Sequence, residues 1–216
     1  MPAPPTKTAI SSPTDGARTL DESASTRERL LIAAEQLAAT QRWSGLTMAE
    51  VARLAGVSRQ TVYNEFQNKT ALGEQVAMRS ARRLLATVQE EVSRHRELAP
   101  AIAGAVKLAL DLAEEEPLVR AVLTGARGGD ESLLPFLTTR AGPILDMAAA
   151  ALAAQVHDQW PHLDRAEAEL LAESSVRLIV SHIVQATESH EQTGRRVAWM
   201  LARAVGELDA STPLPA

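Results

Sequence analysis

The stretch TMAEVARLAGVSRQTVYNEF, residues 47–66, decides the fold of the N-terminal third of this chain. Thr47 and Glu50 have the spacing of a capping box, which predicts a short helix starting at residue 47. Gly56 supplies the left-handed backbone conformation of a tight turn, and Ser58 caps a second helix that runs to the end of the stretch. Two short helices joined by a glycine-containing turn are the geometry of a helix-turn-helix.

The apolar residues of this stretch have the spacing needed to pack the two helices together, which turns the polar ones outward. An outward Arg59 can pair with guanine, and an outward Gln60 or Asn64 can pair with adenine. Serine, threonine and tyrosine hydroxyls suit phosphates, and a lysine at the next helix start adds a cation to that favourable dipole. The predicted DNA-contacting residues are Thr47, Ser58, Arg59, Gln60, Thr61, Tyr63, Asn64 and Lys69.

The longer stretch TMAEVARLAGVSRQTVYNEFQNKTAL, residues 47–72, preceded by TRERLLIAAEQLAA, resembles the TetR family of bacterial transcriptional regulators. The resemblance covers about the first third of the chain. It implies an N-terminal head that binds double-stranded operator DNA, a body that binds a small effector, and a homodimer. The residues at the family's spacing are Thr47, Val51, Ala52, Ala55, Gly56, Val57, Ser58, Tyr63, Phe66, Lys69 and Leu72.

The composition predicts an all-α protein. Hydrophobic residues make up 45% of the 216, and aromatic residues only 3%, a mixture that favours helix over sheet. The chain has no cysteine, which excludes disulfides, thiolate zinc sites and cysteine nucleophiles. No apolar run approaches 18 residues without charges, so we expect a cytoplasmic protein with no membrane partner. No Gly-rich phosphate loop appears in the sequence, and we expect no cofactor.

Charge is divided unevenly along the chain. Residues 26–94 carry ten Lys/Arg against seven Asp/Glu, whereas residues 95–216 carry ten against seventeen. A basic N-terminal part and an acidic remainder are typical of a DNA-binding head on a body that does not bind DNA. We predict a disordered tail at 1–25, a three-helix DNA-binding domain at 26–70, and a helical ligand-binding and dimerisation domain at 71–216.

Beyond the head, amphipathic patterns predict a long helix at 68–94 and further helices near 101–115, 117–124, 132–156, 164–190 and 192–209. Long aliphatic side chains with few aromatics suit a slender apolar effector. Two arginines in otherwise apolar stretches, Arg140 and Arg177, are candidates to bind a ligand carboxylate or to pair with a nearby glutamate. The predicted pocket residues are Leu85, Val88, Val106, Leu110, Leu123, Leu137, Arg140, Ile144 and Arg177.

The body is also similar to actinobacterial TetR-like regulators of alkane and fatty-acid metabolism, through PFLTTRAGPILDMAAAAL and ESSVRLIVSHIVQ. That resemblance implies a repressor released by a fatty acid or an acyl thioester, with an unrelated lipophilic compound as the alternative. The last two helices carry strong apolar stripes, which in such proteins form a four-helix dimer interface. The predicted interface residues are Ile179, Ile183, Val197, Leu201, Val205 and Leu208.

Two other classes of protein compete with this interpretation. His157, Asp158, His162 and Asp164 form the densest cluster of possible metal ligands, but their spacing fits no zinc motif, so we do not expect an enzyme. An architectural DNA-binding dimer without an effector is the other alternative. The long, acidic, apolar-lined body is more than such a protein needs.

Overall fold

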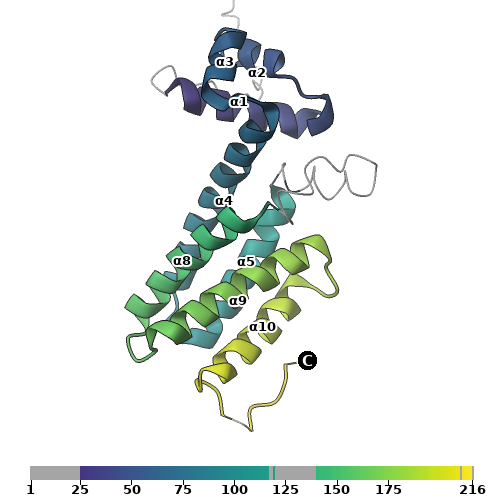
Figure 1. Ribbon diagram of the computed structural model, residues 1–216. Coiled ribbons are helices and arrows are strands. Elements are labelled where there is room, and N and C mark those ends of the chain that lie inside the picture. The colour runs from purple at the N-terminus through teal and green to yellow at the C-terminus, as the bar shows by residue number, and fades with distance from the viewer. Residues whose placement is uncertain (1–24, 117–118, 120–139, 210, 216) are drawn as a thin grey trace, which may run out of the picture.

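The computed structural model describes residues 25–116, 119, 140–209 and 211–215, and every regular element in these residues is helical. The predicted all-α class is therefore confirmed. Figure 1 shows a small helical head at one end of a long helix, and a body of helices packed along the other end of that helix. The elements are α1 (Thr26–Thr40), the 3-10 turn η1 (Trp43–Gly45), α2 (Met48–Leu54), α3 (Arg59–Phe66), α4 (Lys69–Ser93), α5 (Leu98–Glu115), α8 (Gly142–Gln159), α9 (Arg165–Val184) and α10 (His190–Ala204).

Side-chain caps start the two short helices of the head at the predicted positions. Thr47 Oγ1 accepts a hydrogen bond from Glu50 N at 3.2 Å, and Thr47 N donates to Glu50 Oε2 at 2.8 Å, which completes the capping box. The hydrogen bonds that Thr47 donates hold the pKa of the Glu50 carboxyl below its usual value. Ser58 Oγ accepts from Thr61 N at 3.1 Å and caps α3.

The turn between α2 and α3 depends on Gly56. Its φ of +68° lies in the left-handed region, as predicted, and Val57 N donates to Ala52 O at 3.0 Å to close the turn. A side chain in this conformation brings Cβ too close to the following carbonyl oxygen. The turn therefore sets the angle at which α3 leaves α2.

Helix α4 belongs to two hydrophobic cores. Its first turns bury Leu72 and Val76 among the apolar side chains of α1, α2 and α3. Its later turns bury Leu85 and Val88 in the core of the body. The head is thus completed by residues that follow the predicted domain boundary at residue 70.

The body is built around α5. Helix α5 packs against α4, α9 and α10, and α8 packs against α9 and α4. In Figure 1, α8 and α9 run side by side along the body, and α10 lies at the edge away from the head. Among the residues that the structure describes, no helix is long and apolar enough to span a membrane.

Some helix ends differ from the prediction. Helix α9 ends at Val184, and α10 starts after Ser189, because Ser189 and Gln192 form a capping box that starts a new helix. Helix α10 ends at Ala204, since Gly206 adopts a φ of +78°. The predicted tail falls almost wholly on residues 1–24, and the predicted helix at 117–124 on a stretch of which only residue 119 is described, so both lie outside the described residues.

Replacing Gly56 with alanine should destabilise the head. A Cβ at this glycine would meet no neighbouring atom, so the cost comes from the backbone conformation alone, about 1–2 kcal/mol. Gly45→Ala is the matched control, because Gly45 also faces open space and its φ is not positive. Urea denaturation measures both variants. Equal stability of the two would contradict the role given to the Gly56 conformation.

Candidate functional site

The outward face of α3 presents the predicted base-reading side chains together. Val62 and Phe66 are buried and anchor the helix, which leaves Arg59, Gln60 and Asn64 exposed. Gln60 Nε2 donates to Asn64 Oδ1 at 2.9 Å. Side chains four residues apart on a helix are neighbours, so this hydrogen bond holds two amides in a defined orientation on the exposed face.

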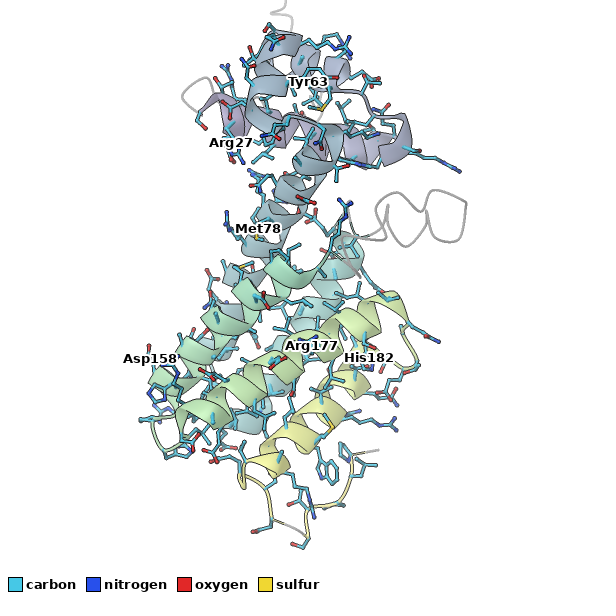
Figure 2. All side chains as sticks on the ribbon, viewed as in Figure 1. Arg27, Tyr63, Met78, Asp158, Arg177 and His182 are labelled. Atoms are coloured by element: carbon cyan, nitrogen blue, oxygen red, sulfur yellow. The ribbon has the colours of Figure 1, made fainter. Side chains whose placement is uncertain are left out.

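Arg59 is also positioned by a neighbour. Its guanidinium lies 5.6 Å from the Tyr63 ring centroid, and its Nη2 donates to Tyr63 Oη at 3.5 Å. Figure 2 shows Tyr63 in the head, at the far end of the molecule from Arg177 in the body. The face is therefore a polar surface with a cation and two amides, the groups that recognise base edges in the major groove.

The hydroxyls and the lysine predicted to contact phosphates lie beside this face. The Ser58 and Thr61 hydroxyl oxygens are 2.8 Å apart, and Thr47 lies at the start of α2. Lys69 Nζ donates to Ser44 O at 2.9 Å and lies over a tryptophan ring, which holds it at the start of α4. None of these contacts tests DNA binding, and these residues remain predicted contacts.

A second candidate site is a pocket between α4, α5, α8 and α9. It has a cavity of about 140 Å³ and is partly open. Only two of its described lining residues, Ser80 and Glu116, carry polar side chains, and both lie near the end of the pocket that faces the head. The remaining described lining residues are Ala77, Ala81, Leu84, Leu85, Val88, Ala109, Ala113, Val119, Ile144, Leu145, Ala148, Leu152, Val176, Ile179, Val180 and Ile183.

A narrower cavity continues deeper into the body. It shares Val88, Leu152 and Ile179 with the main pocket and reaches Trp160. All but one of its described lining residues are apolar. The two cavities are therefore neighbours, and the three apolar side chains that they share line both of them.

An ion-pair cluster connects the pocket to the head. Arg79 on α4 lies 2.6 Å from Glu28 and 2.5 Å from Glu35, both on α1. Arg83, one turn further along α4, lies 3.0 Å from Glu35 and 3.5 Å from Glu116. Burial alone would lower the pKa of Arg79, but the hydrogen bonds to the two α1 carboxylates outweigh it and raise that pKa above its usual value.

Only some of the predicted pocket residues line the main pocket. Val106 lines the deeper cavity, and Leu110 is buried in the body core without lining either cavity. Leu123 and Leu137 lie outside the described residues. The predicted residues that line the main pocket are Leu85, Val88 and Ile144.

Arg140 and Arg177 do not line this pocket, so their predicted place in it is wrong, and the alternative that each pairs with a nearby glutamate is confirmed. Arg140 is exposed and pairs with Glu74 of α4 at 3.2 Å. Arg177 is exposed on α9 and pairs with Glu173, one turn away, at 2.9 Å (Figure 2). A guanidinium that reaches water and a carboxylate has no reason to enter an apolar cavity.

Several predicted dimer residues are placed inside the chain instead. Val197 and Leu201 are only 5% and 4% exposed, because their face of α10 packs against α5 of the same chain. Ile179 and Ile183 line the pocket. Val197 and Leu201 are thus buried within their own chain and do not lie on the surface of one subunit. Ile179 and Ile183 are half-buried, and their place in a dimer interface stays a prediction. Val205 and Leu208 are half-buried beyond the end of α10.

Other apolar side chains of α9 and α10 do face outward. Leu170, Val184 and Met200 are 51%, 41% and 44% exposed. In the sequence these residues belong to the same apolar stripes as the buried ones. The stripes alone do not show which side of each helix packs against the rest of the chain and which side stays exposed.

The histidine cluster is dispersed in the structure. His162 Nε2 lies 2.6 Å from Glu207 Oε1, and Asp164 caps α9 in a capping box with Glu167. In the part of the chain that the structure describes, no three side chains of metal-binding types come together.

Two family models match the chain. Residues 30–76 match bacterial regulatory proteins of the tetR family, and residues 97–203 match the C-terminal domain of the bacterial tetracyclin repressor. The HTH-type transcriptional regulator AlkX of Mycobacterium tuberculosis (strain ATCC 25618 / H37Rv) is 32% identical over 176 residues, which cover 81% of this chain and 82% of that protein.

Solved structures share the fold. The TetR family repressor AlkX from Dietzia sp. strain DQ12-45-1b, described as implicated in biodegradation of n-alkanes, is 26% identical with a TM-score of 0.72, over 85% of this chain and 97% of that one. The R. erythropolis transcriptional repressor QsdR is 19% identical with a TM-score of 0.61, over 87% and 98% of the two chains.

Arg59→Ala should weaken binding to a specific DNA site by about 1–3 kcal/mol and relax the preference at one base position of each half-site. Lys69→Ala should weaken binding to all sequences alike and reduce the salt dependence of binding. Fluorescence anisotropy with specific and scrambled duplexes over a salt series measures both effects. An Arg59 variant that loses specific and non-specific affinity equally would contradict a base-reading role.

Proposed function

Because the chain belongs to the TetR family of bacterial transcriptional regulators, we propose that it is a repressor released from its operator by a small aliphatic effector bound in the main pocket. The similar proteins named above are transcriptional regulators or repressors, a class without catalytic activity. The proposal adds to the family assignment the place where the effector binds and its chemical class.

One observation carries the proposal: the pocket borders the core of the head. Ala77 of α4 lines the pocket and is also part of the head's buried apolar cluster. Ile144 of α8 lines the pocket and packs against the same cluster. A ligand that moves either side chain acts directly on the packing of the DNA-binding head.

Helix α4 extends this effect over a longer distance. Its 25 residues span roughly 37 Å at about 1.5 Å of rise per residue. Met78 lies on α4 between the head and the body in Figure 2. A small tilt of α4 at the pocket displaces α3 at the other end, and the ligand can shift this equilibrium only by its difference in affinity for the two states.

The pocket lining supports an aliphatic effector. The described side chains that surround it are alanine, valine, leucine and isoleucine except at the polar end, and the neighbouring deeper cavity shares Val88 with it. Such walls suit the hydrocarbon tail of a fatty acid or acyl thioester, or of another aliphatic compound. The Dietzia repressor AlkX is implicated in biodegradation of n-alkanes, and these are aliphatic compounds as well.

Two subunits are needed for the proposed DNA binding. One recognition helix reads few base pairs, and a two-fold dimer on a near-palindromic operator places the half-site centres about 34–36 Å apart, or a multiple of that distance. The exposed Leu170, Val184 and Met200 offer an apolar surface on α9 and α10 for a second subunit. We therefore assign the dimer interface to the outer face of these two helices.

Met200→Asp and Val184→Asp should each shift the protein toward monomer, because a charge buried between subunits is not compensated. Leu214→Asp is the control, since Leu214 is exposed on the C-terminal segment after α10. Sedimentation velocity measures the assembly, and operator affinity should fall with it. Intact dimers in both α9 and α10 variants would exclude this surface as the interface.

Filling the pocket should remove the response to the effector and leave DNA binding intact. Ala148→Phe adds a ring to the pocket wall, whereas Ala150→Phe adds the same ring at an exposed position of α8. Release from operator DNA is titrated with saturated aliphatic compounds of increasing chain length. Release that is unchanged by Ala148→Phe would contradict the pocket. Absence of release or thermal stabilisation by any aliphatic compound would favour the effector-independent architectural dimer.

A further inference from the structure

We infer that Ser80 and Glu116 form the head-group subsite of the pocket, and that this subsite recognises a neutral hydroxyl, as in a primary aliphatic alcohol, in preference to a carboxylate. The inference rests on the proposed function, because it concerns the polar end of the effector that the proposed pocket binds. It replaces the anchoring role that the sequence suggested for Arg140 and Arg177, which lie outside the pocket.

The position of the subsite follows from the lining. Ser80 is buried on α4, and Glu116 follows the last turn of α5, so the two side chains meet across the pocket wall. Ser80 Oγ donates to Glu116 Oε1 at 3.2 Å. A polar ligand group placed elsewhere along the described lining would lose its hydrogen bonds to water and gain none. Within the described lining, only this end offers side-chain hydrogen bonds to a polar ligand atom, so we place that atom here.

The hydrogen-bonding capacity of the two residues selects the group. A carboxylate accepts at about four positions, and Glu116 uses two of them, for Ser80 and for Arg83. An alcohol inserted between the two side chains donates its proton to Glu116 and accepts one from the Ser80 hydroxyl. Ser80 and Glu116 then each keep a hydrogen-bond partner, and the ligand's oxygen gains two hydrogen bonds.

A ligand carboxylate meets the opposite situation. It has no proton to donate to Glu116, and it brings a like charge beside it. The described ion-pair cluster at this end already holds three carboxylates (Glu28, Glu35 and Glu116) against the guanidiniums of Arg79 and Arg83. An unsubstituted alkane fits the walls but makes neither hydrogen bond. The order of affinity follows as alcohol, then alkane, then carboxylate.

The same subsite contacts the head through one side chain. Arg83 Nη2 donates to Ser80 Oγ at 3.3 Å and lies 3.5 Å from Glu116, while its Nη1 lies 3.0 Å from Glu35 of α1. A ligand hydroxyl at the subsite therefore contacts two partners of Arg83, and Arg83 connects them to Glu35 in the DNA-binding head.

The test compares three ligands with the same eight-carbon chain: n-octanol, n-octane and octanoate. Calorimetry measures their binding to the full-length protein, and anisotropy measures release of operator DNA. Octanol should bind wild-type protein at least about tenfold more tightly than octanoate, because octanoate brings a like charge beside Glu116 and octanol does not. Ser80→Ala should weaken the binding of octanol severalfold and leave the binding of octane unchanged.

Glu116→Gln removes the charge but keeps an acceptor oxygen, so the affinity for octanol should change by less than about threefold. The affinity for octanoate should rise until it is no longer below that for octanol. Glu115→Gln is the control, because Glu115 is exposed at the end of the same helix and does not line the pocket. If octanoate binds wild-type protein as tightly as octanol or more tightly, the inference is overturned and the proposed function stands. An unchanged ligand preference in Glu116→Gln would also overturn it. Failure of all three ligands to bind would overturn both.

Discussion

Helix α4 is buried at one end in the core of the head and at the other in the core of the body, and the remaining structure depends on this shared burial. Leu72 and Val76 pack with α1, α2 and α3, and Leu85 and Val88 pack with the body. Large apolar side chains in well-packed cores resist displacement, so a shift in one core is transmitted along a stiff helix to the other. We propose that the orientation of the head depends on the pocket through this helix.

The pocket lies where this coupling is most direct. Ala77 belongs to its wall and to the head's core, and the adjacent turns of α4 carry the arginines that pair with α1. Exposed ion pairs such as Arg177–Glu173 contribute little to stability. The Arg79 pairs differ from them because the guanidinium is partly buried and contacts two carboxylates at once. Apolar packing and a partly buried ion-pair cluster thus connect the same two parts of the chain.

The head could be predicted closely from sequence because local rules specify it. Thr47, Ser58 and Gly56 act through hydrogen bonds or backbone conformation within a few residues of themselves, so their patterns are visible in the sequence. The body could be predicted only as a set of helices. The apolar stripe of α10 shows that Val197 must be buried, but whether α5 or a second subunit buries it depends on tertiary packing.

The polar end of the pocket could not be predicted from the sequence, because it also depends on tertiary packing. Glu116 appears in the sequence only as part of an acidic helix end, and Ser80 as a small residue in a long helix. They become a site because α5 packs against α4 and brings the two side chains within hydrogen-bonding distance.

The most direct test of the coupling between pocket and head is a distance measurement. The chain has no cysteine, so a single spin label can be attached at Ala49→Cys, an exposed position on α2. Pulsed electron resonance then measures the distance between the labels of the two heads in a dimer. We predict that operator DNA and a saturating aliphatic effector shift this distance in opposite directions. A distance that stays constant while calorimetry shows the effector bound would contradict the account.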